Sequence, residues 1–285
     1  MMIAAIGDLV EDIAVGLTTS VNAASDTTAI IRHRRGGSAA NAAVAVARLG
    51  SPSRFIGQVG DDAVGTALID ALCDAGVQPM VHRGGRTGTI IVLLDTAGER
   101  TMLTDRGACT LLDDPDPAWL DGVSVLHVPL YSLVGQPLAT TTRTLIEWAR
   151  ERSVQVSIDA SSASVIVDRG VAATIAELAT LAPDVLLCNE FEAQTLGGTE
   201  ALRGVARRAL VVKRGAGPTL VVEPGNPPLE IVVPELRDVA DTTGAGDAFA
   251  AGFLVAWSGG ADAMSAVVAG HASAREAIIR IAAAT

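Results

Sequence analysis

The chain has 285 residues, of which 49% are hydrophobic, 19% are charged and only 3% are aromatic. This length suits one large domain, and the apolar residues are spread over segments too short to span a bilayer. The formal net charge of −11 argues against binding to nucleic acid through a basic surface.

The first ten residues, MMIAAIGDLV, have no basic leader and run directly into Glu11 and Asp12. They are typical of a strand rather than a signal peptide, so we expect a cytoplasmic protein. The cysteines Cys73, Cys109 and Cys188 are isolated and odd in number. This spacing favours reduced thiols over disulfides or a zinc site.

Short apolar segments alternate with segments of helical periodicity along most of the chain, which predicts a parallel sheet covered by helices on both faces. The predicted strands are 3–7, 53–57, 123–128, 154–159, 184–188 and 209–212, and the predicted helices are 38–50, 61–76, 137–153, 171–182 and 248–257. Gly50 and Gly76 lie where helix C-caps are expected. Residues 13–36 and 86–105 are instead typical of β-hairpins, the second turning at 95–98. We therefore predict a single α/β domain over 1–285, with these two segments forming a small β-sheet that acts as a lid.

The segment DTTGAGD (241–247) leads into a helical run with no proline. Its glycines and unpaired backbone N–H groups would form an anion site at the helix N-terminus. Asp247 would repel a phosphate but could accept a proton from an attacking hydroxyl. Taken alone, Asp247 is better explained as a helix cap. A dinucleotide-binding motif lacks its third glycine because residue 249 is Phe, and the chain has no P-loop.

Three segments together resemble the ribokinase-like (PfkB) carbohydrate kinase family: RRGGSAANAAVAVARLG (34–50), FIGQVGDDAVG (55–65) and DTTGAGDAFAAGF (241–253). They occur in the order and spacing of the family, and the resemblance covers essentially the whole chain. It implies a ribokinase-like three-layer α/β/α fold with a mostly parallel central sheet. It also implies ATP-dependent phosphorylation of a sugar or nucleoside hydroxyl, with ATP and Mg²⁺ as cofactors.

The resemblance assigns a role to each matching residue. It makes Asp247 the catalytic base, with Gly244, Ala245 and Gly246 as the anion hole. It places Asp12 and Asn41 on substrate hydroxyls, behind a turn made by Gly36 and Gly37. A polyol needs such carboxylate and amide partners, although either residue alone is more simply explained as an ordinary polar residue at a strand or helix end.

On the nucleotide side, NEFE (189–192) matches the N-x-x-E motif of the family. This match implies that Asn189 lies in the nucleotide site and that Glu192 holds Mg²⁺ through water; a helix start rich in Glu is the simpler explanation. The strand and turn VVKRGAG (211–217) match the nucleotide-holding segment, which assigns Lys213, Gly215 and Gly217 to it. His271 occupies the position from which the family usually directs an asparagine toward adenine.

Several positions depart from ribokinase. Tyr131 aligns where ribokinase holds ribose with a glutamate, so ribose is not the expected substrate. Arg100 and Arg106 come from the predicted lid and could bind a carboxylate or phosphate of the substrate, or simply face solvent. The family's monovalent-cation loop corresponds to Asp241 and Thr243, but the chain ends at Thr285, and we do not expect potassium activation.

These features favour a small sugar-like substrate, because the few aromatic residues make a nucleoside pocket hard to assemble. A nucleoside or vitamin-precursor kinase, and a ligand-binding member without catalysis, remain as alternatives, and a dehydrogenase is more distant. We expect no nucleic-acid or membrane partner. The exposed edges of the lid permit a homodimer.

Overall fold

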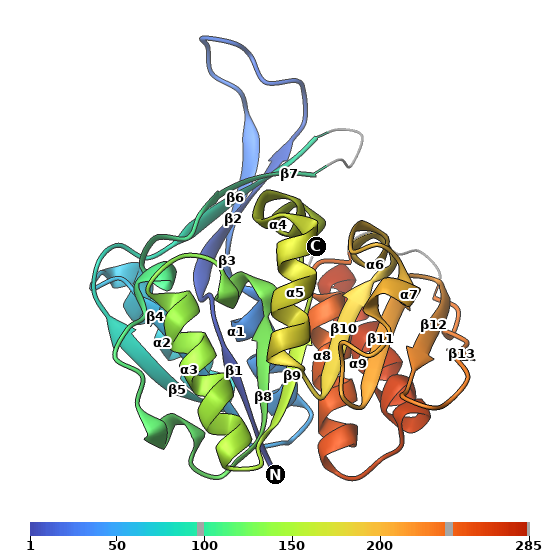
Figure 1. Ribbon diagram of the computed structural model, residues 1–285. Coiled ribbons are helices and arrows are strands. Elements are labelled where there is room, and N and C mark those ends of the chain that lie inside the picture. The colour runs from blue at the N-terminus through green and yellow to red at the C-terminus, as the bar shows by residue number, and fades with distance from the viewer. Residues whose placement is uncertain (96–99, 237–241, 284–285) are drawn as a thin grey trace.

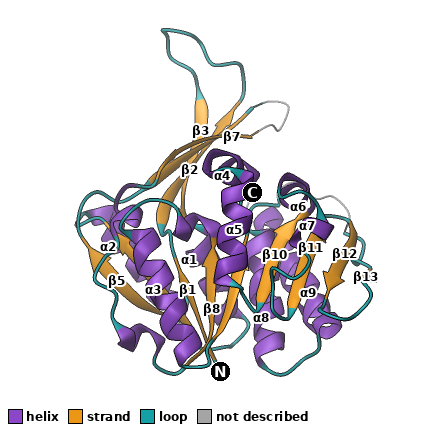
Figure 2. Cartoon of the chain, viewed as in Figure 1, coloured by secondary structure: helices purple, strands orange, loops and turns teal. Residues whose placement is uncertain are grey.

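The computed structural model describes residues 1–95, 100–236 and 242–283, and it is built around one large sheet (Figures 1 and 2). Its strand order is β13-β12-β11-β10-β9-β8-β1-β4-β5. From β11 to β5 all neighbours are parallel, whereas β12 and β13 add antiparallel strands at one edge. The strands are β1 (Met2–Ile6), β4 (Ser53–Val59), β5 (Val77–Arg83), β8 (Val123–Pro129), β9 (Gln155–Asp159), β10 (Val185–Asn189), β11 (Ala209–Arg214), β12 (Gly217–Val222) and β13 (Leu229–Ile231).

Helices cover both faces of this sheet. One face carries α1 (Ser38–Arg48), α2 (Ala63–Asp74), α8 (Ala245–Ser258) and α9 (Ala263–Ala283). The other carries α3 (Leu138–Glu151), α4 (Ala163–Arg169), α5 (Val171–Leu181), α6 (Glu190–Thr195) and α7 (Thr199–Leu202). Short 3-10 turns η1 (Gly107–Leu111), η2 (Pro117–Leu120) and η3 (Leu130–Leu133) complete the connections. Because the central strands are buried on both faces, they are continuous apolar runs such as VLLC in β10.

A second, four-stranded sheet projects from one end of this body (Figure 1). It has the order β3-β2-β6-β7, with β2 (Val10–Leu17), β3 (Ala29–Gly36), β6 (Thr89–Leu94) and β7 (Arg100–Asp105). The predicted hairpins β2–β3 and β6–β7 are antiparallel, and they join through a parallel pairing of β2 with β6. Both hairpins therefore form one sheet, as the sequence predicts.

The predicted fold class, a three-layer α/β/α body with a mostly parallel sheet and a small extra sheet, is confirmed. Every strand and helix named from the sequence is present within one to three residues of its predicted bounds. No helix in the described ranges has both the length and the apolar character needed to cross a membrane.

Candidate active site

Asp247 lies in the first turn of α8, where the chain enters the helix through a left-handed glycine. Gly244 is the N-cap, with φ 72°, a conformation that favours glycine over any residue with a side chain. The N–H of Ala245 donates to the carbonyl oxygen of Thr242 at 3.0 Å. An anion bound at this helix start would compete with that bond, while the helix dipole would favour its charge.

Burial raises the pKa of Asp247 to about 7, although a hydrogen bond from Asn41 lowers it. Asn41 Nδ2 donates to Asp247 Oδ2 at 3.0 Å, so a residue of α1 contacts one of α8 across 206 positions of sequence. Asp159 further raises the pKa, and Lys213 and Ser38 lower it. A carboxylate with this pKa changes charge in the range where a general base is useful.

The Asp12 carboxylate lies close to the backbone of Gly36, in the turn that Gly36 and Gly37 make. A Cβ on Gly36 would lie 2.1 Å from Asp12 Oδ1, so only glycine leaves room for this carboxylate. Asp12 Oδ1 is buried and has no hydrogen-bond partner among the described residues. Burial raises its pKa to about 6, against the lowering effect of Arg35 and Arg34. A buried acceptor without a partner suits a hydroxyl donor from a bound molecule.

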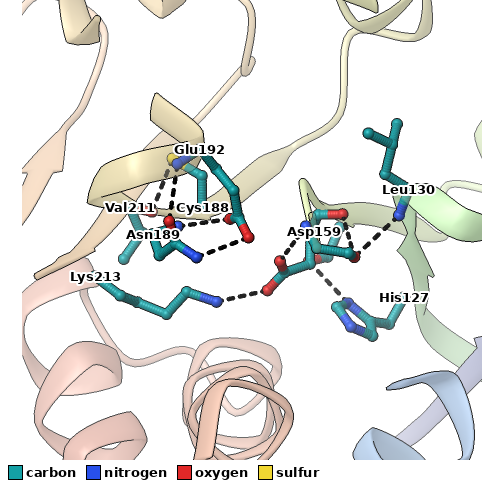
Figure 3. Close-up of polar contacts among 10 residues, drawn as sticks. His127, Leu130, Asp159, Cys188, Asn189, Glu192, Val211 and Lys213 are labelled. Carbon is teal, nitrogen blue, oxygen red and sulfur yellow. Dashed lines mark hydrogen bonds and ion pairs between the residues drawn. The ribbon is translucent and has the colours of Figure 1, made fainter. Parts of the chain in front are cut away.

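A second polar cluster lies at the carboxyl ends of β9, β10 and β11 (Figure 3). Lys213 Nζ donates to Asp159 Oδ2 at 2.7 Å. Asn189 and Glu192 form a capping box at the start of α6, in which Asn189 Nδ2 donates to Glu192 Oε1 at 2.7 Å. Burial opposes the charge of Lys213, but Asp159 and Glu192 outweigh it and hold its pKa above the ordinary value.

Asp247 and the second polar cluster face one cavity of about 900 Å³, whereas Asp12, Gly36, Gly37 and Asn41 are not among its lining residues. Its polar wall includes Ser38, Asp159, Asn189, Glu192, Lys213, Gly215, Ala245, Gly246 and Asp247, and its apolar wall includes Phe249, Val268, Ala272 and Ile278. A Cβ at Gly246 would lie 3.7 Å from Lys213 Nζ, so the lysine and the predicted anion hole adjoin each other. The predicted catalytic and nucleotide residues therefore line a common space, except Gly244 and Gly217, which are not among its lining residues.

His271 also lines this cavity and is 7% exposed. Its Nε2 lies 2.8 Å from the Thr219 hydroxyl, and its Nδ1 is buried without a partner in the part of the chain that the structure describes. The ring is tilted against Phe249, with 5.5 Å between the centroids. Burial lowers the pKa of His271, so a neutral imidazole lines the cavity.

The structure surrounds Arg106 with internal acceptors. Its guanidinium donates through Nε and Nη2 to both Asp8 oxygens at 2.8 Å, and to the carbonyl oxygens of Val134 and Tyr131. A substrate anion would have to displace Asp8 to reach this guanidinium. In the structure, the Arg106 side chain instead connects the end of β7 to the main α/β body. The Tyr131 ring lies beside the same guanidinium, whose Cζ is 5.9 Å from the ring centroid.

Three predictions fall wholly or partly outside the described residues: the hairpin turn at 95–98, Asp241, and the side chain of Arg100, whose backbone begins β7. Two further site residues were not predicted from the sequence. Asp159 carried a usable signal, because it ends a buried strand at the edge where ligands of α/β proteins bind. Arg35, whose Nη1 donates to Asn41 Oδ1 at 2.9 Å, follows from no motif that we recognised.

Comparison with known proteins agrees with this architecture. The model of the pfkB family carbohydrate kinases matches residues 2–285. A fructokinase from Klebsiella pneumoniae is 34% identical over 245 residues, covering 77% of this chain and 75% of the relative. The bifunctional protein HldE of Pseudomonas fluorescens is 29% identical; the match covers 75% of this chain but only 45% of HldE. An adenosine kinase structure from Sinorhizobium meliloti superposes with a TM-score of 0.84 at 24% identity, covering 95% of this chain and 92% of that one.

The fold and these relatives define a kinase that transfers a phosphoryl group to a hydroxyl. More particularly, the chain belongs to the pfkB family of carbohydrate kinases, as the three sequence motifs indicated.

Proposed function

We propose that this protein is an ATP-dependent kinase that phosphorylates a hydroxyl of a sugar or sugar-like molecule, with Asp247 as the general base. One observation carries the proposal: Asp247 lies in the N-terminal turn of α8, on the wall of a cavity large enough for a nucleotide. The base and the anion site are thereby within reach of the same reacting atoms.

The acceptor would bind on the side of Asp12 and Asn41. The vacant Oδ1 of Asp12 would accept from one hydroxyl, and the attacking hydroxyl would give its proton to Asp247. As that proton leaves, negative charge develops on the transferring group. The backbone N–H groups at residues 244–246 and the ammonium group of Lys213 would stabilise this charge.

ATP would occupy the remaining cavity, with its base against Phe249, Val268 and His271 and its phosphates toward Lys213 and Gly246. The donor set suits Mg²⁺, because Glu192 and Asp159 supply the carboxylate oxygens that hard cations prefer. When bound, Mg²⁺ would neutralise phosphate charge, with Glu192 contacting it through water. Glu192 is already held by Asn189, so it would keep its place before the cation arrives.

The small sheet would act as a lid that excludes water from the reaction. Ile31 and Leu103 on its strands are both more than half exposed, which supports pairing with a second copy of the chain. A nucleoside acceptor is the alternative substrate class, supported by the structural likeness to an adenosine kinase. The cytoplasmic location stays a prediction from the sequence.

The test is ADP release from MgATP against a panel of hexoses, pentoses, 2-keto-3-deoxy acids, sugar phosphates and nucleosides. Asp247→Asn should lower turnover with the preferred acceptor by about 10²–10⁴-fold while ATP still binds, because only proton transfer is lost. Asp262→Asn is the matched control, since Asp262 is an exposed residue at the start of α9. Normal turnover by Asp247→Asn would contradict the mechanism, and a nucleoside as the best acceptor would favour the alternative.

A further inference from the structure

Arg35 is the last arginine of β3, and its side chain connects the small sheet to the catalytic helices. It pairs with Glu11 in the sheet register, yet its Nη1 donates to Asn41 Oδ1 on α1 at 2.9 Å. Asn41 Nδ2 in turn donates to Asp247 Oδ2 on α8 at 3.0 Å. Three elements that are distant in sequence thus form one hydrogen-bonded chain that ends on the proposed base.

The hydrogen bonds from Arg35 and to Asp247 determine the orientation of the Asn41 amide. A guanidinium can only donate, so the neighbour of Arg35 must be the amide oxygen, and the amide NH₂ is left for Asp247. An amide turned the other way would set its NH₂ against the guanidinium and its oxygen against the carboxylate. Both contacts would then be repulsive when Asp247 is ionised, so the two ends of the chain favour the same orientation.

We propose that Arg35 is a positioning residue for the phosphoryl transfer: it orients the Asn41 amide so that this amide holds the Asp247 carboxylate in its ionised, reactive form. Arg35 acts through Asn41 and needs no contact with the substrate. The inference rests on the proposed role of Asp247 as the general base.

The other charges around Asp247 explain why such help is needed. Asp159 is a carboxylate within electrostatic reach of Asp247, and Lys213 is a nearby cation on β11. Lys213 is already paired with Asp159 at 2.7 Å. Arg35 lies within electrostatic reach of both Asp247 and Asp12. It is therefore a cation on the acceptor side, opposite Lys213.

A fixed charge at Arg35 is also physically maintained at neutral pH. Burial lowers the pKa of Arg35 to about 10, with Arg48 adding to the effect and Asp247 and Asp12 opposing it, so the guanidinium stays protonated. Placing a charge in this half-buried position disfavours folding unless it is compensated. The free energy lost on burying this charge is consistent with a role for Arg35 in the site.

The pH dependence of activity should depend on Arg35. Asp247 must lose its proton to act as a base, so activity rises with pH through its pKa, which is about 7 in the free protein. Removing Arg35 takes away an opposite charge and frees the Asn41 amide to turn, and both changes favour the protonated carboxyl. The acid limb of kcat/KM should therefore move to higher pH by about one unit.

The experiment compares pH profiles of the full-length wild type, Arg35→Gln, Arg35→Lys and Arg32→Gln, using the best acceptor from the panel. Arg32 is an exposed residue of the same strand, so Arg32→Gln removes the same charge away from the site. We expect the shift in Arg35→Gln, a smaller one in Arg35→Lys because the charge is kept without the planar fork, and none in Arg32→Gln. At pH 7 a one-unit shift lowers the ionised fraction of Asp247 from about one half to about one eleventh, so kcat should fall about 5-fold in Arg35→Gln, while KM for ATP stays near the wild-type value.

Guanidinium ion added to Arg35→Ala gives an independent measurement, since it should restore activity in Arg35→Ala and not in Asp247→Asn. Superimposable pH profiles of wild type and Arg35→Gln would overturn the inference, as would failure of both guanidinium and Arg35→Lys to recover activity. If Asp247→Asn is inactive in that case, only the role of Arg35 is wrong. Full turnover by Asp247→Asn would instead overturn the proposed function and the inference with it.

Discussion

Asp247, the proposed base, is a residue whose burial is unfavourable for folding when its carboxyl is ionised. Its carboxyl is held among Asn41, Asp159 and Lys213, and burial raises its pKa to about 7 from an ordinary value of 3.8. In the unfolded chain the same group ionises near the ordinary value. Between about pH 4 and pH 7 the folded protein therefore holds one more proton than the unfolded chain, and stability falls as pH rises through this window.

Asp247→Asn should consequently stabilise the protein increasingly as pH rises. The asparagine side chain at position 247 carries no charge at any pH. The difference in unfolding free energy between variant and wild type should therefore grow by about 1–3 kcal/mol between pH 4 and pH 8. Asp12, whose pKa is about 6, titrates in the same range but equally in both proteins, so its contribution cancels. Urea unfolding at both pH values measures this difference.

Asp262→Asn is again the control for that measurement. Hydrogen bonds from Ser265 lower the pKa of Asp262, so its contribution to stability is present above the unfolded pKa and is lost as pH falls. Its variant should show no gain toward high pH. An equal stability difference for Asp247→Asn at pH 4 and pH 8 would show that this carboxyl is not desolvated.

Among the elements, the packing of α8 on α9 decides where the helix N-terminus lies. Gly252 is the closest point, because a Cβ there would lie 2.5 Å from the Ala269 carbonyl oxygen and 2.7 Å from Ser273 Cβ. Backbone at that distance cannot move aside like a flexible side chain. The two helices must separate to admit even a methyl group.

Gly252→Ala should therefore lower the unfolding free energy by about 1–3 kcal/mol, despite the better helix propensity of alanine. Because α8 carries Asp247 at its start, turnover should fall as well. The control is Gly259→Ala at the C-cap of the same helix, where φ is −75° and the nearest atom lies at 3.2 Å. Thermal unfolding and ADP release on both variants test this packing argument, and a Gly252→Ala protein as stable as the control would refute it.

For the molecule as a whole, the small sheet has two faces with different surroundings. Ile31 pairs with Val15, and Leu103 pairs with Ile91, which in turn pairs with Ile13. Because successive strand residues point to opposite faces, Ile31 and Leu103 lie on the face opposite Asp12. They are 58% and 54% exposed. A lid covering its own active site would turn this apolar face outward, toward a second copy of the chain.

Light scattering should accordingly give twice the chain mass for the wild type and the chain mass for the double variant Ile31→Lys with Leu103→Lys. Two buried lysines would leave unpaired charges in the interface. The matched control is Val167→Lys with Ile279→Lys, which changes exposed apolar residues of α4 and α9 and should remain dimeric. A wild type that is monomeric at all concentrations would exclude the dimer.

Agreement between sequence and structure is closest where short-range chemistry acts. The buried strands and the helices between them follow from local periodicity, and the hairpin signals of residues 13–36 and 86–105 predict a separate sheet. β5 was not predicted, because VQPMVHR includes a proline and polar residues. It forms at the sheet edge, where a strand needs hydrogen bonds on only one side.

The sequence by itself determined the family, the fold class and several of the residues that line the cavity, since motif order and periodicity are present along the chain. Only the tertiary structure decided the partners of each charge. It paired Arg106 with Asp8 and Lys213 with Asp159, and it connected Arg35 through Asn41 to Asp247. Such pairings depend on distances of a few ångströms between residues up to 206 positions apart. No local pattern encodes those distances, because they result from the packing of all the elements together.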